Sequence, residues 1–447
     1  MSNSEETAKL EDLTPISDER RSIPLWSYIP TWWAAMIVVM IFAVGFFALY
    51  PYGPVNVIQA TIALALASIF CGFLFLLNGY PGYNKGIPYT VQVRSSFGVR
   101  GGKIATVIRS LPAICWLGIA TWAGGLAINV ITQTLWGFGN EWAYFIVFLV
   151  INVFLAMRGI TMMKQFNTVG GFILVSLMTF TLIHVLRGGG FETYEAFTYE
   201  GTWGYGFWSV FATGVACIIT GALNVSDMSR HLIKSKGRRN HWVGHLAGIA
   251  PAYFYMLFLG ILYGMTTGTA DPVAAMMTIS PSVAMGVAVM AFVLSAQISS
   301  NLTLNILPPT HTFQDISRRI SWRRGVIISA IISLGTCPWI LFTSEHYYTF
   351  MNVYSCFLGP IIGITLADYW VVSKQEVDVD ALYDRREGSK YWYKNGFSIA
   401  AIISLIVGAV ISLAWVEISW MIGLPVAFVL YVILKKVVGM ERVKAME

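Results

Sequence analysis

The feature that most constrains this chain is a long stretch that lacks charge. No Lys, Arg, Asp or Glu occurs from Ser22 to Asn84. Because a helix needs about 20 apolar residues to cross the hydrocarbon core of a bilayer, this stretch is long enough for two membrane spans. Charged residues make up 12% of the chain, whereas soluble proteins contain about 25%. The sequence therefore predicts a polytopic membrane protein.

The rest of the chain repeats this pattern, and the whole sequence predicts twelve membrane-spanning helices. The apolar runs are long and do not alternate, unlike the roughly 10-residue alternating strands of membrane barrels, so we expect an all-α integral membrane fold. The expected spans cover residues 30–50, 57–80, 105–135, 141–157, 165–186, 206–225, 242–267, 283–306, 325–343, 347–372, 395–416 and 419–437.

The basic residues predict the orientation, because loops rich in Lys and Arg stay in the cytoplasm. With the N-terminus inside and twelve spans, only Arg187 of the 29 basic residues falls in an outer loop. We therefore expect both termini in the cytoplasm. The short tails and loops favour a bacterial cell (inner) membrane. The net charge of +6 is then a signal of topology and does not indicate a nucleic-acid partner.

Ionisable groups inside the expected spans are too sparse for an enzyme. Asp227 and Asp368 lie at the inner ends of their spans, where we expect them to anchor loop arginines such as Arg230. No P-loop, HExxH or CxxC motif occurs, and all five cysteines fall within spans, which favours free thiols. The six histidines show no metal-ligand spacing. We predict no enzymatic activity and no cofactor.

Neutral polar residues supply the chemistry of the spans instead. Ser299 and Ser300 follow Ala296 by three and four residues, so the three share one helical face. Two hydroxyls together with carbonyl oxygens of an unwound neighbouring helix can hold a Na⁺ ion. Hydrogen bonding between helices is the alternative role for these serines.

Two further spans carry candidate features for a ligand. The sixth contains Gly214 and Gly221, which bracket a stretch that can unwind as broken helices do in secondary transporters. The third contains Trp116 in mid-span, away from the interfacial belts that Trp prefers. Its ring is suited to stacking on a flat heterocycle, and simple packing is the alternative.

Four stretches together carry a family resemblance. They are residues 94–101, the pattern N-x-x-D-x-[ST]-R at 224–230, residues 299–309, and residues 350–384. In this order and spacing they resemble the nucleobase–cation symporter family 1, the permeases for cytosine, purines, uracil, allantoin and hydantoins. The resemblance runs from about residue 23 to residue 384.

The resemblance implies a fold of two inverted five-helix repeats, with the first and sixth helices broken at the midplane, and two extra helices. The implied divisions are a cytoplasmic tail (1–22), the first repeat (23–187), the second repeat (188–373), an inner loop with the last two spans (374–438), and a C-terminal tail (439–447).

The resemblance also implies a sodium site, with Na⁺ as the coupling ion. By matching position, Ala34 and Ile37 on the first span and Ala296 on the eighth donate backbone carbonyl oxygens. Ser299 and Ser300 donate hydroxyl oxygens. Ser300 stands where Thr also occurs in the family, so the ligand oxygen is retained.

The implied substrate site is less well matched. Trp116 corresponds to the stacking Trp, Asn305 to an amide that bonds the polar edge of the ring, and Met351, beside Phe350, to the gate. Carbonyls around Cys217 complete the site. Three positions depart from the family pattern: Ala120 and Val38 replace glutamines, and Ile218 replaces a second tryptophan. A site that has lost these groups is expected to take a less polar or differently shaped ligand than hydantoin.

Taken together, these residues favour a symporter that imports a small planar nitrogen heterocycle, a nucleobase or related compound, with Na⁺. A proton-coupled or uncoupled permease of the same family, for allantoin, pyrimidine vitamin precursors or another ligand, is the alternative. A membrane receptor or channel and an amino-acid carrier of related architecture also stay open.

Overall fold

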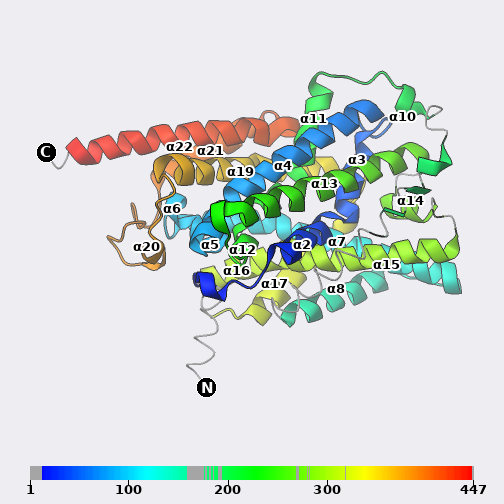
Figure 1. Ribbon diagram of the computed structural model, residues 1–447, viewed down its shortest axis with the longest axis horizontal. Coiled ribbons are helices and arrows are strands. Elements are labelled where there is room, and N and C mark those ends of the chain that lie inside the picture. Colours follow the sequence, from blue (N-terminus) through cyan, green and yellow to red (C-terminus); the bar gives the residue numbers. More distant parts are fainter. Residues whose placement is uncertain are drawn as a thin grey trace.

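The computed structural model describes residues 13–158, 194–267, 271–278, 282–317 and 319–444, with isolated positions between 176 and 189 and at 280. These residues form helices joined by short loops and isolated β-bridges. The long helices lie roughly along the longest dimension of the molecule (Figure 1). The observed secondary structure is therefore helical, as the sequence predicts.

The longer helices are α2 (Leu25–Met36), α3 (Val39–Ala48), α4 (Val57–Lys85), α7 (Gly101–Trp136), α8 (Glu141–Met157), α11 (Tyr205–Leu223), α13 (Arg239–Thr267), α15 (Val283–Ser300), α16 (Leu307–Ile316), α17 (Trp322–Leu334), α19 (Tyr347–Leu366), α21 (Ile399–Leu413) and α22 (Ser419–Lys444). Shorter ones are α5 (Tyr89–Gln92), α6 (Arg94–Phe97), α10 (Glu195–Thr198), α12 (Ser226–Ser229), α14 (Pro272–Thr278), α18 (Pro338–Leu341) and α20 (Val379–Tyr383). Two π-helical segments, Asn301–Ile306 and Ala367–Val372, continue α15 and α19.

Among the described residues, seven helices are long and apolar enough to cross a membrane, and the bent pair of α2 and α3 makes an eighth. α8 and α21 are apolar but shorter, with 17 and 15 residues. Each expected span except the fifth coincides with a helix or helix pair. The fifth, at 165–186, lies mostly outside the described residues.

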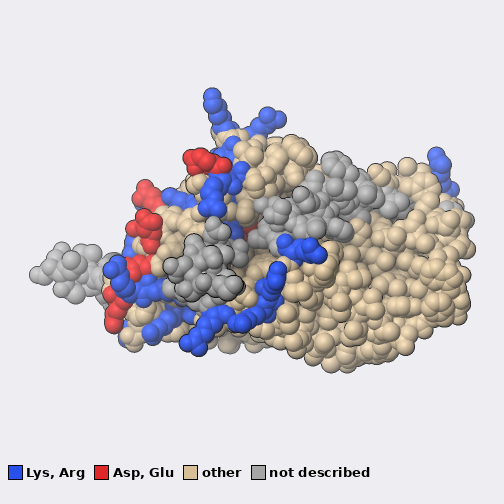
Figure 2. All heavy atoms as spheres, turned by 90° about the horizontal axis from the view of Figure 1, so that it is seen from below, with Lys and Arg blue, Asp and Glu red and all other residues tan. Residues whose placement is uncertain are grey.

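The outer faces of the helices are apolar. On α4, a stripe at helical spacing is 40–55% exposed, formed by Ile58, Ile62, Leu66, Ile69 and Phe73. A continuous exposed apolar stripe is stable only where something other than water covers it. Lys and Arg gather instead over the end of the molecule that holds α20 and the C-terminus, and residues other than Lys, Arg, Asp and Glu cover most of the other half (Figure 2). This distribution is that of a multi-pass membrane protein with one basic end.

The first membrane helix is broken as expected. α2 ends at Met36, α3 begins at Val39, and the two helices are bent by 54°. The break has extended backbone at Val38, whose φ is −140°. α13 packs along α2, α3 and α4, while α15 packs against α2 and α3. The break is therefore enclosed by protein, where irregular backbone is tolerated at membrane depth.

The sixth helix differs from the expectation of a second break. α11 continues without interruption from Tyr205 to Leu223. A Cβ added at Gly214 would lie 2.8 Å from Leu64 and 2.9 Å from Ala67. At Gly221 it would lie 3.0 Å from Phe75. The two glycines thus permit close packing of α11 on α4 and do not unwind the helix.

Part of the expected N-terminal tail is folded onto the protein, and residues 13–24 are named here the N-terminal strap. Its Arg21 side chain is 6% exposed and donates hydrogen bonds to the carbonyl oxygens of Arg230 and Leu232, at 3.0 and 3.3 Å. Asp18 forms an ion pair with Lys234 at 3.0 Å. These contacts attach the strap to the loop that follows α12.

Candidate functional site

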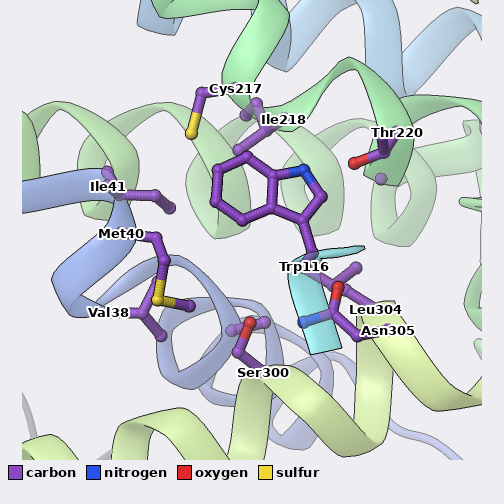
Figure 3. Close-up of a pocket in the computed structure, with 12 residues that line it drawn as sticks. Val38, Met40, Ile41, Trp116, Cys217, Ile218, Thr220, Ser300, Leu304 and Asn305 are labelled. Atoms are coloured by element: carbon purple, nitrogen blue, oxygen red, sulfur yellow. The ribbon is translucent and has the colours of Figure 1, made fainter. Parts of the chain in front are cut away.

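A small cavity lies beside the break in the first helix. It holds about 30 Å³, room for one or two water molecules. Residues from α2, α3, α7, α11, α15 and its π-helical continuation line it (Figure 3): Ala35, Val38, Met40, Ile41, Trp116, Cys217, Ile218, Thr220, Gly221, Ser300, Leu304 and Asn305. A planar heterocycle is larger than this space, so side chains or helices must move to admit one.

The break leaves two carbonyl oxygens without their usual helical donors. The N–H of Val38 donates to Met36 at 3.1 Å, whereas a regular helix would direct it to Ala34. The N–H of Ile41 donates to Val38 at 3.1 Å, whereas the regular acceptor would be Ile37. These are the two carbonyls of the first span that the sodium-site prediction names.

The hydroxyls of that prediction lie on α15, which packs against α2. Ala296, Ser299 and Ser300 are all buried, with exposed fractions of 0%, 1% and 4%. Ser300 lines the same cavity as Val38, which lies in the break, and Ala35, which lies near the end of α2. The Ser300 hydroxyl has no hydrogen-bond partner among the described residues. The donor set is therefore made of neutral oxygens.

Trp116 is held at the centre of an aromatic cluster. Its ring meets those of Tyr347 and Phe350 edge to face, with centroids 5.8 and 5.4 Å apart. Its indole N–H donates to the hydroxyl of Tyr354 at 3.3 Å. These contacts fix the ring in one orientation, with one part of it facing the cavity (Figure 3).

Asn305 belongs to a chain of amides. Its side-chain NH₂ donates to the side-chain oxygen of Asn301 at 2.9 Å, and Asn301 in turn donates to Asn152 on α8 at 3.2 Å. Asn305 lines the cavity, and Figure 3 shows its side-chain oxygen on the side of Trp116. The amide can accept a hydrogen bond there.

Three of the other predicted substrate-site residues, Ala120, Phe350 and Met351, do not line the cavity. Ala120 follows Trp116 by one helical turn on α7 and is fully buried. Met351 is also fully buried, while its neighbour Phe350 touches the edge of Trp116. Cys217 and Ile218 do line the cavity.

Sequence reasoning missed several residues of this site. Met40 and Leu304 line the cavity, and Gln297, fully buried on α15, donates to the Met40 sulfur at 2.8 Å. The carbonyl oxygen of the Gln297 side chain has no hydrogen-bond partner among the described residues. Tyr354 donates to the carbonyl of Ala216 at 2.7 Å and lies 3.4 Å from that of Cys217. The sequence around Tyr354 does not indicate that its hydroxyl bonds a carbonyl of another helix.

Asp227 and Asp368, which the sequence predicts to anchor loop arginines, have other partners in the structure. Asp227 accepts from the backbone N–H of Tyr89 at 2.9 Å and lies 3.8 Å from His311. Asp368 accepts from the hydroxyl of Tyr431 at 2.7 Å. In these contacts the two carboxylates bind groups of other helices instead of the loop arginines that the sequence predicts.

Residues of two family motifs, Asn224 and Arg94, make buried polar contacts with other helices. Asn224, which ends α11, accepts a hydrogen bond from Arg109 of α7. Arg94 pairs with Asp315 of α16 at 2.5 Å, and both side chains are 2% exposed. Arg385 makes a second contact to Asp315 at 2.8 Å. These polar contacts join α7 to the end of α11 and α6 to α16.

No metal site of the carboxylate, thiol or imidazole type exists in the described part of the chain, where no group of three such side chains could hold an ion.

Comparison with known proteins agrees with these features. Residues 15–439 match the model of the family described as permeases for cytosine/purines, uracil, thiamine and allantoin. The allantoin permease of Bacillus subtilis is 28% identical, over 96% of this chain and 93% of its own length. The hydantoin permease of Microbacterium maritypicum is 26% identical, over 94% and 87%. These relatives are permeases and not enzymes.

A solved structure has the same fold. It is that of Mhp1, a nucleobase-cation-symport-1 family transporter, in a closed conformation with bromovinylhydantoin bound. The TM-score is 0.85 at 25% identity, over 96% of both chains. The inward-facing conformation of Mhp1 gives 0.83. With the family model matched along nearly its whole length, this chain belongs to the nucleobase–cation symporter family of permeases for cytosine/purines, uracil, thiamine and allantoin.

Proposed function

We propose that this protein is a secondary active transporter that imports a small planar nitrogen heterocycle together with Na⁺. The observation that carries the sodium coupling is the pair of redirected backbone amides at Val38 and Ile41. They free the carbonyls of Ala34 and Ile37 next to the helix that bears Ser299 and Ser300. Broken helices of this kind supply carbonyl ligands for Na⁺ in secondary transporters.

The chemistry of the donor set fits a monovalent cation. Three carbonyls, from Ala34, Ile37 and Ala296, and two hydroxyls, from Ser299 and Ser300, present only neutral oxygens. Hard cations are bound by oxygen ligands of this type. No carboxylate has to change its protonation for such a site to fill or empty, which favours Na⁺ over a proton as the coupling ion.

The cavity favours a ligand with one polar edge. Trp116 offers an aromatic face, and Asn305 offers a hydrogen-bonding amide. The walls formed by Val38, Ile41 and Ile218 offer only hydrocarbon. A site whose polar groups must be matched rejects ligands that leave them unpaired. We therefore propose a nucleobase, allantoin or a pyrimidine vitamin precursor as the substrate class, ahead of hydantoin.

Coupling requires that the ion favour one state of the carrier, because a ligand shifts a conformational equilibrium only by its differential affinity. We propose that Na⁺ links α2 to α15 and favours the outward-open state. The heterocycle then stacks on Trp116, and Phe350 and Met351 close over it. The basic end of the molecule is proposed to face the cytoplasm, with both termini, in the cell membrane.

Uptake into proteoliposomes tests this proposal. Purified protein is reconstituted and offered radiolabelled allantoin, uracil, cytosine, a purine and thiamine, under an inward Na⁺ gradient and under choline. Accumulation of one compound above equilibrium that depends on the Na⁺ gradient is expected. Uptake that follows a pH gradient and ignores Na⁺ would identify a proton-coupled permease instead. An ohmic current that does not saturate with substrate would indicate a channel.

A further inference from the structure

We infer that Thr220 is a substrate-binding residue and that Tyr354 positions its hydroxyl toward the ligand. The inference rests on the proposed function, since it assigns a role within the same cavity. It concerns a threonine on α11 that lines the cavity and is 6% exposed.

A threonine inside a helix ordinarily bonds its own helix. Its hydroxyl can donate to the carbonyl oxygen three or four residues earlier. This chain follows that rule repeatedly: Thr31 donates to Ser27 at 2.8 Å, Thr61 to Val57 at 2.7 Å, and Thr121 to Leu117 at 2.6 Å.

Thr220 departs from the rule. The acceptors within its reach would be the carbonyls of Ala216, four residues earlier, and Cys217, three earlier. Tyr354 contacts both, with its hydroxyl 2.7 Å from the first oxygen and 3.4 Å from the second. Each carbonyl has two lone pairs, and in a regular helix one is used by the backbone N–H four residues on. The Tyr354 hydroxyl thus occupies the side of these carbonyl oxygens to which the Thr220 hydroxyl would otherwise donate.

The hydroxyl of Thr220 consequently has no partner among the described residues. Figure 3 shows its oxygen directed toward the side of the Trp116 indole that carries the nitrogen. That nitrogen is already satisfied, because it donates to the Tyr354 hydroxyl. Because Thr220 lines the cavity, its hydroxyl is available to hydrogen-bond a ligand bound there.

Thr220 and Asn305 together determine which edge of the ligand is hydrogen-bonded. Thr220 comes from α11 and Asn305 from the continuation of α15, and both line the cavity beside Trp116. The hydroxyl can donate or accept, and the free oxygen of the amide accepts. The ligand class that satisfies both is a planar heterocycle with a carbonyl group next to a ring N–H. The remaining ring edge then faces hydrocarbon.

Binding of labelled uracil and allantoin to purified wild type and variants tests the assignment. Thr220→Val removes the hydroxyl at nearly constant volume and is expected to weaken binding about tenfold, the range for one lost hydrogen bond. Thr220→Ser should restore most of the affinity. Thr61→Val, whose hydroxyl bonds its own helix, is the matched control and should bind as wild type does.

Tyr354→Phe separates positioning from direct contact. It should free the Ala216 carbonyl, let Thr220 turn back to its own helix, and weaken binding as much as Thr220→Val does. The double variant should then bind no more weakly than Thr220→Val alone. Losses that multiply in the double variant, or a Thr220→Val protein that binds as wild type does, would overturn the inference.

A structure of Tyr354→Phe gives a check that needs no ligand. The Thr220 oxygen is expected about 3 Å from the Ala216 carbonyl oxygen, a normal hydrogen-bond distance. An unchanged threonine rotamer would overturn the positioning role. A wild type that binds none of the panel compounds would contradict the proposed function, and the rotamer would still decide the role of Tyr354.

Discussion

The backbone N–H of Val38 donates to the carbonyl oxygen of Met36 at 3.1 Å. This turn replaces the bond that a continuous helix would make to Ala34, and it separates α2 from α3 at a bend of 54°. The freed carbonyls, the buried serines of α15 and the cavity beside Trp116 occupy one region. The proposed ion and substrate sites are therefore adjacent, so that one break in a helix serves both.

Trp116 is expected to provide the stacking surface for the substrate. Trp116→Ala should weaken binding of the transported heterocycle by about 10- to 100-fold, since stacking of a base on an aromatic side chain contributes about 1–3 kcal/mol. Trp122→Phe is the matched control, because Trp122 packs against Trp142 and Trp339 and does not line the cavity. Equal losses in both variants, measured by equilibrium binding, would contradict the stacking role.

The close contact between α3 and α13 is expected to depend on glycine. A Cβ added at Gly45 would lie 2.0 Å from the backbone oxygen of Leu257, and no side-chain movement can relieve a clash with backbone. Gly45→Ala should therefore destabilise the protein by about 1–3 kcal/mol or more, the cost of overpacking. Gly188→Ala, with nothing within 4 Å, should not. Thermal denaturation in detergent distinguishes the two, and equal melting temperatures would contradict the packing account.

The buried charge cluster at the basic end is expected to be sensitive to loss of Asp315. Asp315→Ala leaves Arg94 buried without its ion-pair partner, and breaking a buried pair costs about 3–5 kcal/mol. Asp384→Ala removes only the partner of the exposed Arg386 and should leave the melting temperature unchanged, because surface ion pairs contribute little. A melting temperature of Asp315→Ala equal to that of wild type would contradict this role.

The N-terminal strap is expected to loosen at acidic pH. Partial burial would raise the pKa of Asp18, but its hydrogen bonds from Lys234 and Arg21 outweigh this and lower the pKa below its ordinary value of 3.8. A carboxyl with a lowered pKa in the folded state stabilises that state above its unfolded pKa and loses this effect as the pH falls. Hydrogen exchange of residues 13–24, corrected for the intrinsic rate, should therefore rise below about pH 4. Asp18→Asn should show the faster exchange already at neutral pH, and slow exchange in that variant would contradict the account.

Much of the architecture could be predicted because the lipid bilayer restricts which segments of a chain can cross it. The bilayer demands long uncharged helices, and the basic residues sort to one end, so spans and their order can be read from charge alone. The burial of Ser299 and Ser300 on α15 is consistent with the helical spacing, and their role as sodium ligands stays a prediction. The break at Ile37 and Val38 required the family resemblance, since nothing in these apolar residues opposes a continuous helix.

Other parts of the site could not be predicted, because they depend on contacts between residues far apart in the sequence. A glycine such as Gly214 or Gly221 can either let a helix unwind or let a neighbouring helix pack closely, and the sequence is the same in both cases. Only the position of α4 shows that these two glycines serve close packing. Tyr354 reaches the carbonyl of Ala216 across 138 positions in the chain. The Thr220 hydroxyl acquires its direction from that contact.

The sodium dependence of substrate binding in Ser300→Ala tests the central claim most directly. Affinity for the transported heterocycle is measured in Na⁺ and in choline for wild type, for Ser300→Ala, and for Ser329→Ala, a buried serine of α17 that bonds its own helix. Wild type and Ser329→Ala should bind more tightly in Na⁺. Ser300→Ala should bind in Na⁺ only as tightly as wild type does in choline. A Ser300→Ala protein whose affinity still rises with Na⁺ as in wild type would contradict the sodium site.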